Sequence, residues 1–548
     1  MRTKRMLALW VALMLAFAMA GGASGQGEVE KSSLGNTAVT DQQVLGMIEN
    51  GVELPISETP ITVTCMYPRP TEVGSYDDMW FFQELARLTG ITIQMQPIES
   101  AGWEEKKALA FASGDLPDIF LSGLTKNDEN TYGPQGYLQP LNELIAQHAP
   151  ITGYLFENSE GAIKTMTCSD GNIYSSPTFC FVEREVVGGQ RCYINTGWLD
   201  KLGLEKPTNL DELYEVLVAF RDGDPNGNGE QDEIPLSGAS KGNTAAMIMY
   251  AFGYADLRHD VIDGQYKYVP LQSEYRHYLE YMNKLFEEGL LDSEYISQGA
   301  EQITAKSAGE LIGITADTGG VPKVSPDQLE AYEGLGALTS DYCDTLTWAA
   351  TPTFNRGGTF AITSYCEVPE QMIKLLDFFY TQQGSVMVRC GPSEEQVPGG
   401  WTMIQVDGVD TFETHYAEAG YTSFWTFRAE NTVMNAPYLD SAETKVAQYL
   451  TYADPQQRWL TKSVLVDTQN AEIARLAYPD VSFTQEENEI INTFVDLDSY
   501  VDQMEARFIT GETSIEQEYD GFIQRIQDMN VDQMIDVRQA AYDRWNAQ

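Results

Sequence analysis

The residues with the most specific chemistry lie in one acidic, glycine-rich stretch, residues 222–236, with the sequence DGDPNGNGEQDEIPL. Oxygen-bearing side chains stand at every second position from Asp224, and Gly227 and Gly229 lie between them. A loop that curls around a hard cation needs converging carboxylate and amide oxygens, with glycine where the chain turns sharply. The calcium-loop pattern D-x-[DN]-x-[DN]-G fits residues 224–229. The stretch therefore predicts a structural Ca²⁺ site, with a metal-free acidic turn as the alternative.

Six residues are the candidate calcium ligands, and they lie close together in the chain: Asp224, Asn226, Asn228, Glu230, Asp232 and Glu233. The glutamate that usually closes such a loop at its twelfth position is missing, because Pro235 stands there. Asp232 and Glu233 are its expected substitutes. A helix predicted to begin at Thr208 runs directly into the loop, so the cation would fasten the end of that helix to the following segment.

The length and the order of elements predict an α/β protein with two lobes. A chain of 548 residues is longer than one hydrophobic core usually holds. Strands and helices alternate near the start, with strands at 61–66, 91–95 and 119–121 and helices at 78–88 and 103–112. This order favours a largely parallel sheet, whose ligands bind at the carboxyl ends of the strands.

Charge and the N-terminus limit the partners and the location. The formal net charge of −47 makes nucleic acid and anionic lipid headgroups poor partners. Residues 1–25 combine basic residues, a short apolar run and small residues, which predicts a signal peptide, with an uncleaved anchor as the alternative. Residues 26–58 are small, polar and acidic and predict a flexible leader. We expect an exported protein, extracellular, periplasmic or associated with the cell envelope.

The seven cysteines do not predict a zinc site, because none of them belongs to a C-x-x-C pair. In an exported chain one or more disulfides are possible, and buried thiols are the alternative. The odd number leaves at least one thiol over unless two chains are joined.

An ordered set of motifs resembles a known family. The segments are ASGDLPD at 112–118, GYLQPLNEL at 136–144, DGNIYSSP at 170–177, YINTGWLDKLG at 193–203 and the acidic loop itself. Together they resemble the extracellular solute-binding proteins of ABC importers, in the carbohydrate-type family 1 branch that includes LipO-like and calcium-containing alginate-binding proteins. Many members of this branch carry a lipid-modified cysteine after the signal peptide, but here no cysteine precedes Cys65, so a lipobox is not evident.

The resemblance implies a two-lobed type II periplasmic-binding fold with a hinge and a ligand cleft between the lobes. It implies that residues 59–186 and 351–428 form the first lobe, and residues 187–350 and 429–548 the second. It also implies a monomer that captures a carbohydrate, most simply an oligosaccharide, and presents it to an importer permease. The acidic charge balance favours a neutral sugar over uronates, and one arginine in the pocket would reverse that preference. For the loop, the resemblance implies that the calcium is structural and that Glu230 contributes its backbone oxygen.

The candidate ligand-binding residues are loop aromatics and groups at strand ends: Tyr67, Arg69, Ser122, Gly123, Tyr174, Trp348, Trp401 and Trp425. Aromatic faces stack on the C–H faces of sugar rings, and a few polar groups bind the hydroxyls. The alternative for each tryptophan is a place in the core. Asp115 and Asp118 are expected to hold their loop by side-chain-to-backbone hydrogen bonds.

We predict no enzymatic activity. Residues 238–242 match G-x-S-x-G, but the strand that a nucleophile elbow requires is not predicted before Ser240. A glycosidase with paired carboxylates is the enzymatic alternative, because acidic residues are abundant and only their geometry decides between the two. Because a fold does not fix a function, the sequence is also compatible with a surface glycan-binding or sensor protein, and with a binding protein for peptide or another small solute.

Overall fold

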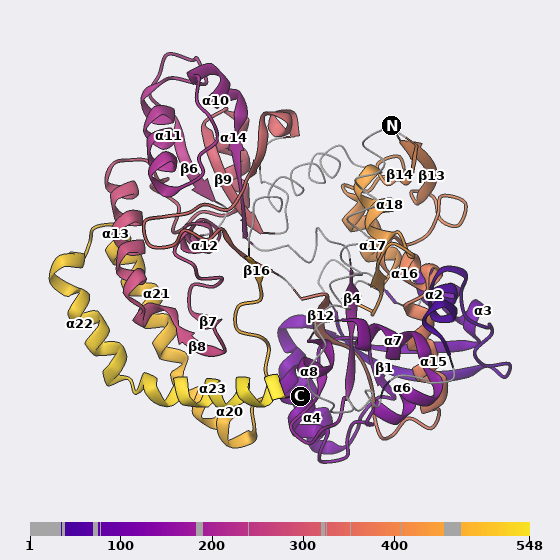
Figure 1. Cartoon of the computed structure of the whole chain (residues 1–548). Helices are drawn as coiled ribbons and strands as arrows, with labels where there is room; N and C mark the ends of the chain where they lie inside the picture. Colours follow the sequence, from indigo (N-terminus) through magenta and orange to yellow (C-terminus); the bar gives the residue numbers. More distant parts are fainter. Residues whose placement is uncertain are drawn as a thin grey trace.

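We describe the fold from a computed structural model. The described residues are 34, 39–69, 75–76, 78–159, 161–181, 190–238, 241–318, 324, 326–350, 352–406, 408–433, 435–453 and 473–547. The predicted signal peptide lies outside them. Figure 1 shows two bodies, one containing β6 and β9 and the other containing β1, β4 and β12, with β16 between them.

The first lobe is built on a six-stranded sheet in the order β15-β4-β12-β3-β1-β2. Its strands are β1 (Ile61–Arg69), β2 (Ile91–Glu99), β3 (Ile119–Phe120), β4 (Ser175–Cys180), β12 (Phe354–Ile362) and β15 (Leu439–Asp440). β1 pairs in parallel with β2 and with β3, and β15 pairs in parallel with β4. β12 runs antiparallel between β3 and β4. The sheet is therefore mixed, with its parallel part where the strand–helix–strand pattern predicted it.

Helices and one hairpin surround this sheet. The helices are α3 (Trp80–Thr89), α4 (Trp103–Ser113), α5 (Lys126–Tyr132), α6 (Asn142–His148), α7 (Pro150–Asn158), α8 (Ala162–Met166), α15 (Pro369–Phe379), α16 (Gln382–Arg389), α17 (Phe424–Asn431) and α18 (Val446–Ala453). The hairpin is formed by β13 (Trp401–Val406) and β14 (Val409–Thr414). α3 ends at Gly90, which has a φ of 72°. A Cβ at Gly90 would lie 2.1 Å from the carbonyl oxygen of Ser57, so only glycine allows this close approach.

The second lobe contains a four-stranded sheet in the order β10-β5-β9-β6. Its strands are β5 (Gln190–Asn195), β6 (Ile234–Gly238), β9 (Ile312–Thr318) and β10 (Tyr332–Leu335), and a hairpin joins β7 (His259–Ile262) to β8 (Gln265–Tyr268). The helices are α10 (Thr196–Leu202), α11 (Leu210–Asp222), α12 (Lys241–Tyr250), α13 (Ser273–Glu287), α14 (Ala300–Ala308), α20 (Gln485–Ile491), α21 (Val495–Ile509), α22 (Ile515–Asp528) and α23 (Val531–Ala547). α13 and α21 pack side by side in the second lobe's own apolar core, which is separate from the main core of the first lobe.

Two short strands mark the junction of the lobes. β11 (Thr347–Ala349) precedes the return of the chain to the first lobe, and β16 (Ile473–Arg475) follows its last passage to the second. The two strands pair in parallel, Thr347 with Ile473 and Ala349 with Arg475. Figure 1 shows β16 in the middle of the molecule. A paired ribbon of crossing segments is a suitable place for a hinge.

Two boundaries differ from those expected. Residues 41–50 form helix α2, which is capped by Thr40 and buries Val44 and Ile48, so this part of the predicted flexible leader is ordered. Its apolar face packs on α7, and this contact supplies the stability that its polar composition does not suggest. Residues 429–453, expected in the second lobe, belong to the first, because β15 joins β4 and α18 packs on β14.

No described helix is long and apolar enough to cross a membrane. No disulfide joins any of the seven cysteines, all of which lie in the described part of the chain.

Candidate functional site

A pocket of about 570 Å³ lies at the junction of the two lobes. Its walls come from both lobes and from the segments that cross between them. The lining residues are Thr165, Thr178, Cys180, Ala350, Pro352, Phe354, Arg389, Tyr438, Asp440 and the run 476–480. We call this cavity the interlobe pocket.

The sheet of the first lobe places one wall of this pocket. β12 and β15 flank β4 on its two sides, with Phe354 opposite Phe179 and Asp440 opposite Cys180. Side chains at the ends of three neighbouring strands therefore lie at the same end of the sheet. The opposite wall, residues 476–480, follows directly after β16, so its position depends on the ribbon at the lobe junction.

The chemistry of the interlobe pocket combines aromatic faces with polar groups. The guanidinium of Arg389 lies 5.7 Å from the ring centre of Tyr438. Tyr478 donates a hydrogen bond from its hydroxyl to the carbonyl of Arg538, at 2.8 Å, which fixes the ring in the second lobe. Asp440 is buried and Asp480 is exposed. Flat rings together with charged and hydroxyl-bearing side chains suit a polyhydroxylated ligand.

A second arginine, Arg428, lies close enough to Arg389 for their charges to interact. Arg428 in α17 is 4% exposed, and its guanidinium lies 5.5 Å from the ring centre of Trp425. Burial lowers the pKa of Arg428 to about 9, and the positive charge of Arg389 contributes to the lowering. Trp425 itself is 58% exposed. The stacked guanidinium supports one face of this indole and leaves much of the ring open to solvent.

Three of the aromatic residues predicted to bind ligand are core residues in this structure. Tyr67, Tyr174 and Trp348 have 1%, 2% and 1% of their surface exposed. The hydroxyl of Tyr174 donates to Asp170 at 2.7 Å, and the ring of Trp348 packs 5.5 Å from that of Tyr250. None of the three lines the interlobe pocket.

The polar candidates at the strand ends have structural partners. Arg69 forms an ion pair with Glu99, its partner across the parallel strand pair. The carbonyl of Gly123 accepts hydrogen bonds from the Trp103 indole at 2.9 Å and from Lys107 at 3.3 Å. Ser122 is half-buried beside it. These groups lie at the end of the parallel strands, as predicted, but none lines the interlobe pocket.

The carboxylate of Asp118 accepts hydrogen bonds from the backbone and the hydroxyl of Thr64, both at 2.7 Å. It therefore fastens the loop before β3 to β1, as the sequence predicted.

Sequence reasoning missed most of the residues that line the interlobe pocket. Tyr438, Arg389 and Tyr478 are separated by 40 or more residues from one another, and none stands in a motif. β15, which positions Asp440, is only two residues long and carries no periodic pattern. The sequence indicates these residues only indirectly, because they lie near the places where the chain crosses between the lobes.

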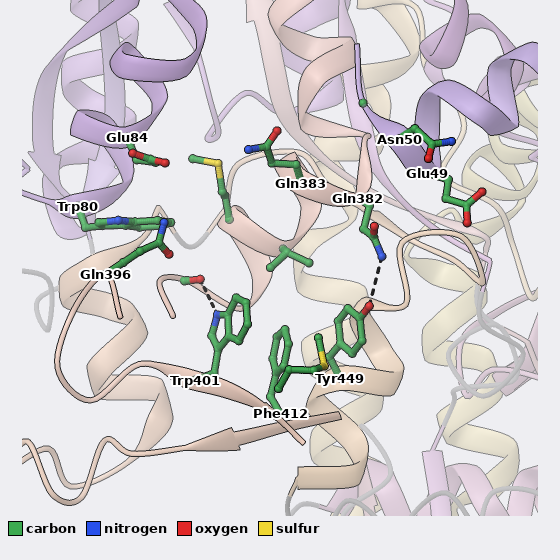
Figure 2. Close-up of a pocket in the computed structure, with 15 residues that line it drawn as sticks. Glu49, Asn50, Trp80, Glu84, Gln382, Gln383, Gln396, Trp401, Phe412 and Tyr449 are labelled. Atoms are coloured by element: carbon green, nitrogen blue, oxygen red, sulfur yellow. Dashed lines mark hydrogen bonds between the residues drawn. The ribbon is translucent and has the colours of Figure 1, made fainter. Parts of the chain in front are cut away.

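A second pocket, of about 480 Å³, is lined by residues of the first lobe and of α2. Trp401 lines it, and it is the one ligand-binding candidate of the sequence analysis among the described residues that line either pocket. Figure 2 shows its ring beside those of Phe412 and Tyr449. Trp401 and Trp425 therefore lie in different surroundings, one in this pocket and the other on the open face of α17.

The acidic loop, residues 224–233, turns back on itself as predicted. Asp224 has a φ of 46°, and its carboxylate accepts hydrogen bonds from the backbone of Gly227 at 2.9 Å and of Gly229 at 3.2 Å. The side-chain amides of Asn226 and Asn228 donate to Asp232 at 3.1 Å. Hydrogen bonds thus join Asn226, Asn228 and Asp232, and those of Asp224 close the same turn, which follows directly after α11.

One carboxylate of the loop has no hydrogen-bond partner in the described part of the chain. Both oxygens of Glu233 are buried and accept no hydrogen bond from the described residues. A buried, unpaired carboxylate is costly, and a cation would relieve that cost. The described residues contain no preassembled group of three or more His, Cys, Asp or Glu side chains around a metal position. The donor set nevertheless fits a calcium ion, since it consists of carboxylate, amide and backbone oxygens.

Comparison with known proteins gives a consistent result. Residues 67–384 match the sequence profile of the family described as bacterial extracellular solute-binding protein. The fructooligosaccharide ABC transporter substrate-binding protein FusA of Streptococcus pneumoniae serotype 4 (strain ATCC BAA-334 / TIGR4) is 27% identical over 518 residues, which are 91% of this chain and 93% of FusA.

Solved structures share the fold. FusA of S. pneumoniae in complex with kestose matches with a TM-score of 0.68 at 24% identity, over 89% of this chain and all of the other. An extracellular solute-binding protein of Bifidobacterium longum subsp. infantis matches with a TM-score of 0.71 at 19% identity, over 89% and 98%. The alginate-binding protein AlgQ2, solved without calcium ion, matches with a TM-score of 0.64 at 21% identity, over 90% and 100%.

Proposed function

This chain belongs to the family of bacterial extracellular solute-binding proteins, and from that premise we propose that it captures an oligosaccharide between its lobes for uptake by an ABC importer. Proteins of this family bind solutes and do not transform them, which agrees with the prediction of no enzymatic activity. The family is also extracellular, in agreement with the predicted export.

The observation that carries the proposal is the interlobe pocket. Tyr438 and Arg389 come from the first lobe, and Tyr478 comes from the second. A ligand held by both walls favours the closed arrangement of the lobes, because only that arrangement lets both walls contact it. Closure about the β11–β16 ribbon would then produce the shape that a permease recognises.

The class of ligand rests on the relatives and on the composition of the walls. FusA is named for fructooligosaccharides and resembles this chain along nearly all of its length. The pocket offers aromatic faces together with hydrogen-bond donors and acceptors. It therefore suits a chain of sugar rings better than a single small ion. The net charge of −47 favours a neutral sugar over a polyanionic one.

Isothermal titration calorimetry tests the function. The probes are kestose, maltotriose, xylotriose, digalacturonate and the tripeptide Ala-Ala-Ala, each titrated into the full protein, and the mixtures are then analysed for cleavage products. We expect one class of glycan to bind, unchanged, and the peptide not to bind. Binding of the peptide alone, or hydrolysis of a glycan, would overturn the proposal.

We propose in addition that the acidic loop binds a structural calcium ion. Asp224, Asn226, Asn228, Asp232 and Glu233 would provide side-chain oxygens and Glu230 its backbone oxygen. The buried carboxylate of Glu233, which accepts no hydrogen bond within the described part of the chain, supports this assignment. The loop lies in the second lobe after α11, and none of its residues lines the interlobe pocket. The ion would therefore stabilise the lobe without contacting the sugar.

A further inference from the structure

The second pocket, introduced above with Trp401, is separate from the interlobe pocket. Among the described residues, the two cavities share no lining residue, and none from the second lobe lines the second pocket. We call it the outer pocket. α16 connects the two, because Gln382 and Met387 line the outer pocket and Arg389, at the end of the same helix, lines the interlobe pocket.

The outer pocket has an aromatic floor that is held in place. The ring of Phe412, which has no solvent exposure, lies between those of Trp401 and Tyr449, with ring centres 3.9 and 4.5 Å apart and interplanar angles of 10° and 19°. Of the three, the half-buried Trp401 is the ring that can offer a face to a ligand. The Trp401 indole donates to the carbonyl of Gly391 at 2.8 Å, and Gln382 donates to the Tyr449 hydroxyl at 3.2 Å. The rings therefore keep their orientation without a ligand, which lowers the entropy cost of binding one.

A fourth aromatic residue and several polar groups complete the cavity. Figure 2 shows Trp80 and Gln396 at one end, Gln383 above the row of rings, and Glu49 with Asn50 at the other end. Trp80 is half-buried, whereas Glu49, Asn50 and Gln396 are exposed. Their carboxylate and amide groups can accept from, or donate to, hydroxyl groups that stand around a ligand ring.

The charge of the lining selects the ligand. Glu49 and Glu84 are the only charged side chains among the described residues that line the cavity, so no lysine, arginine or histidine of this set faces the ligand. The Glu84 carboxylate is paired with Arg87, at 2.6 Å, outside the lining. The lining itself offers an anionic sugar no cation, whereas a neutral sugar presents C–H faces to the rings and hydroxyls to the amides. The volume of about 480 Å³ is within the range of small-molecule sites.

We propose that the outer pocket is a second saccharide-binding site, specific for a neutral sugar, which binds independently of the interlobe pocket. The choice of a sugar rests partly on the proposed function, but the site itself rests on its own rings and amides. Most of its wall lies outside residues 67–384, the part of the chain that matches the family profile, since α2, the hairpin β13–β14 and α18 all lie beyond those limits.

Fluorine NMR of the full protein labelled with 5-fluorotryptophan tests the proposal. The resonances of Trp80, Trp401 and Trp425 are assigned by single Trp→Phe substitutions. Kestose and maltotriose are the neutral probes and digalacturonate is the anionic one. We expect a neutral sugar to shift the Trp80 and Trp401 resonances with a saturable dependence, also in the interlobe variant Tyr438→Ala, and digalacturonate to leave them in place.

Substitutions measure how much individual side chains contribute to sugar affinity at the outer pocket. Trp80→Ala is expected to weaken the binding that Trp401 reports by about tenfold, the loss of one stacking face. Gln396→Ala serves as a second variant that does not touch the aromatic floor, and a measurable loss is expected there too. Tyr365→Ala, at an exposed tyrosine of the same lobe that lines neither pocket, should leave this binding unchanged.

If calorimetry shows a sugar in the interlobe pocket but the Trp80 and Trp401 resonances do not move, the outer site is wrong and the proposed function stands. If the sugar concentration that half-saturates these shifts rises in Tyr438→Ala, in parallel with the loss of affinity at the interlobe pocket, the outer site is not independent and the inference fails. Shifts with a neutral sugar that half-saturate at the same sugar concentration in Tyr438→Ala as in the wild type support the outer site alone. Equal affinity for digalacturonate would overturn the assigned ligand class.

Discussion

The guanidinium of Arg475 binds both carboxylate oxygens of Asp260, a side chain with no solvent exposure. Arg475 is the last residue of β16, so this ion pair fastens the crossing ribbon to the hairpin of β7 and β8 in the second lobe. The same guanidinium also donates to the carbonyls of Gly253 at 3.1 Å and Val261 at 3.2 Å. The position of the ribbon, and of residues 476–480 after it, is therefore set from inside the second lobe.

Arg475→Ala is expected to lower the free energy of unfolding by about 3–5 kcal/mol, because it leaves the Asp260 carboxylate buried without its cation. Urea unfolding followed by circular dichroism measures the loss. Arg276→Ala is the matched control, since Arg276 pairs with Glu280 on the exposed surface of α13. Equal unfolding midpoints for the two variants would show that the buried pair does not stabilise this junction.

Acid should weaken a second buried pair. Asp292 is 4% exposed and accepts hydrogen bonds from Lys306 at 2.7 Å and from Ser237 at 2.6 Å. Burial alone would raise the pKa of Asp292, but these hydrogen bonds outweigh it and hold the pKa below its usual value of 3.8. The folded protein therefore binds this proton more weakly than the unfolded chain does. The stabilisation is complete above the unfolded pKa and is lost as the pH falls through the folded pKa.

Asp292→Asn tests this dependence. Above about pH 5 the wild type should be more stable than the variant, and the difference should shrink as the pH falls below about 4. Urea unfolding at a series of pH values measures both proteins. Asp520→Asn, at an exposed position of α22, should have the same free energy of unfolding as the wild type at every pH. A constant difference between wild type and Asp292→Asn across the series would contradict the prediction.

In the interlobe pocket, Tyr438→Ala is expected to weaken glycan binding by about tenfold through the loss of one aromatic face. The ring is half-buried and lies under Arg389, so the effect on the melting temperature should be small compared with the effect on affinity. Calorimetry with the best glycan of the panel measures the first quantity and differential scanning calorimetry the second. If Tyr438→Ala binds the glycan as tightly as the wild type and as the control Tyr365→Ala, then Tyr438 does not contact the ligand.

The sequence predicted the parallel core of the first lobe because each of its elements carries a local signal. The strands expected at 61–66 and 91–95 are found at Ile61–Arg69 and Ile91–Glu99, and Gly90 ends the helix between them, as expected. The acidic turn was visible for the same reason, since its oxygens and glycines are neighbours in the chain. Local spacing was enough for these features.

The walls of the pockets could not be predicted in this way. Asp440 lies in a strand of two residues that exists only because β4 offers a free edge. Whether a tryptophan is core or surface depends on what packs on it. Trp348 and Trp425 were both expected in ligand-binding loops, but their exposures are 1% and 58%. Contacts between distant segments decide such questions, and a single sequence does not contain them as a pattern.

Calcium should stabilise the protein through the acidic loop. A ligand that binds only the folded state at about 100 times its Kd adds about 2.7 kcal/mol to the free energy of unfolding. We therefore expect EGTA to lower the melting temperature and added Ca²⁺ to restore it, while Mg²⁺ at the same concentration restores less, because it prefers a tighter octahedral shell. Differential scanning calorimetry measures the three states.

Two glutamates of the loop provide a matched pair for the calcium prediction. Glu233→Gln removes the charge from the buried carboxylate that has no hydrogen-bond partner among the described residues, so it should weaken calcium binding by at least about tenfold and abolish the EGTA-sensitive part of the melt. Glu230→Gln changes an exposed side chain but keeps the backbone oxygen that is expected to bind the ion, so its melt should remain EGTA-sensitive. Glycan affinity measured with calcium present should be the same for both variants, because neither residue lines the interlobe pocket. A wild-type melt that EGTA does not change, with Glu233→Gln more stable than the wild type through relief of its buried charge, would instead identify the loop as a metal-free turn.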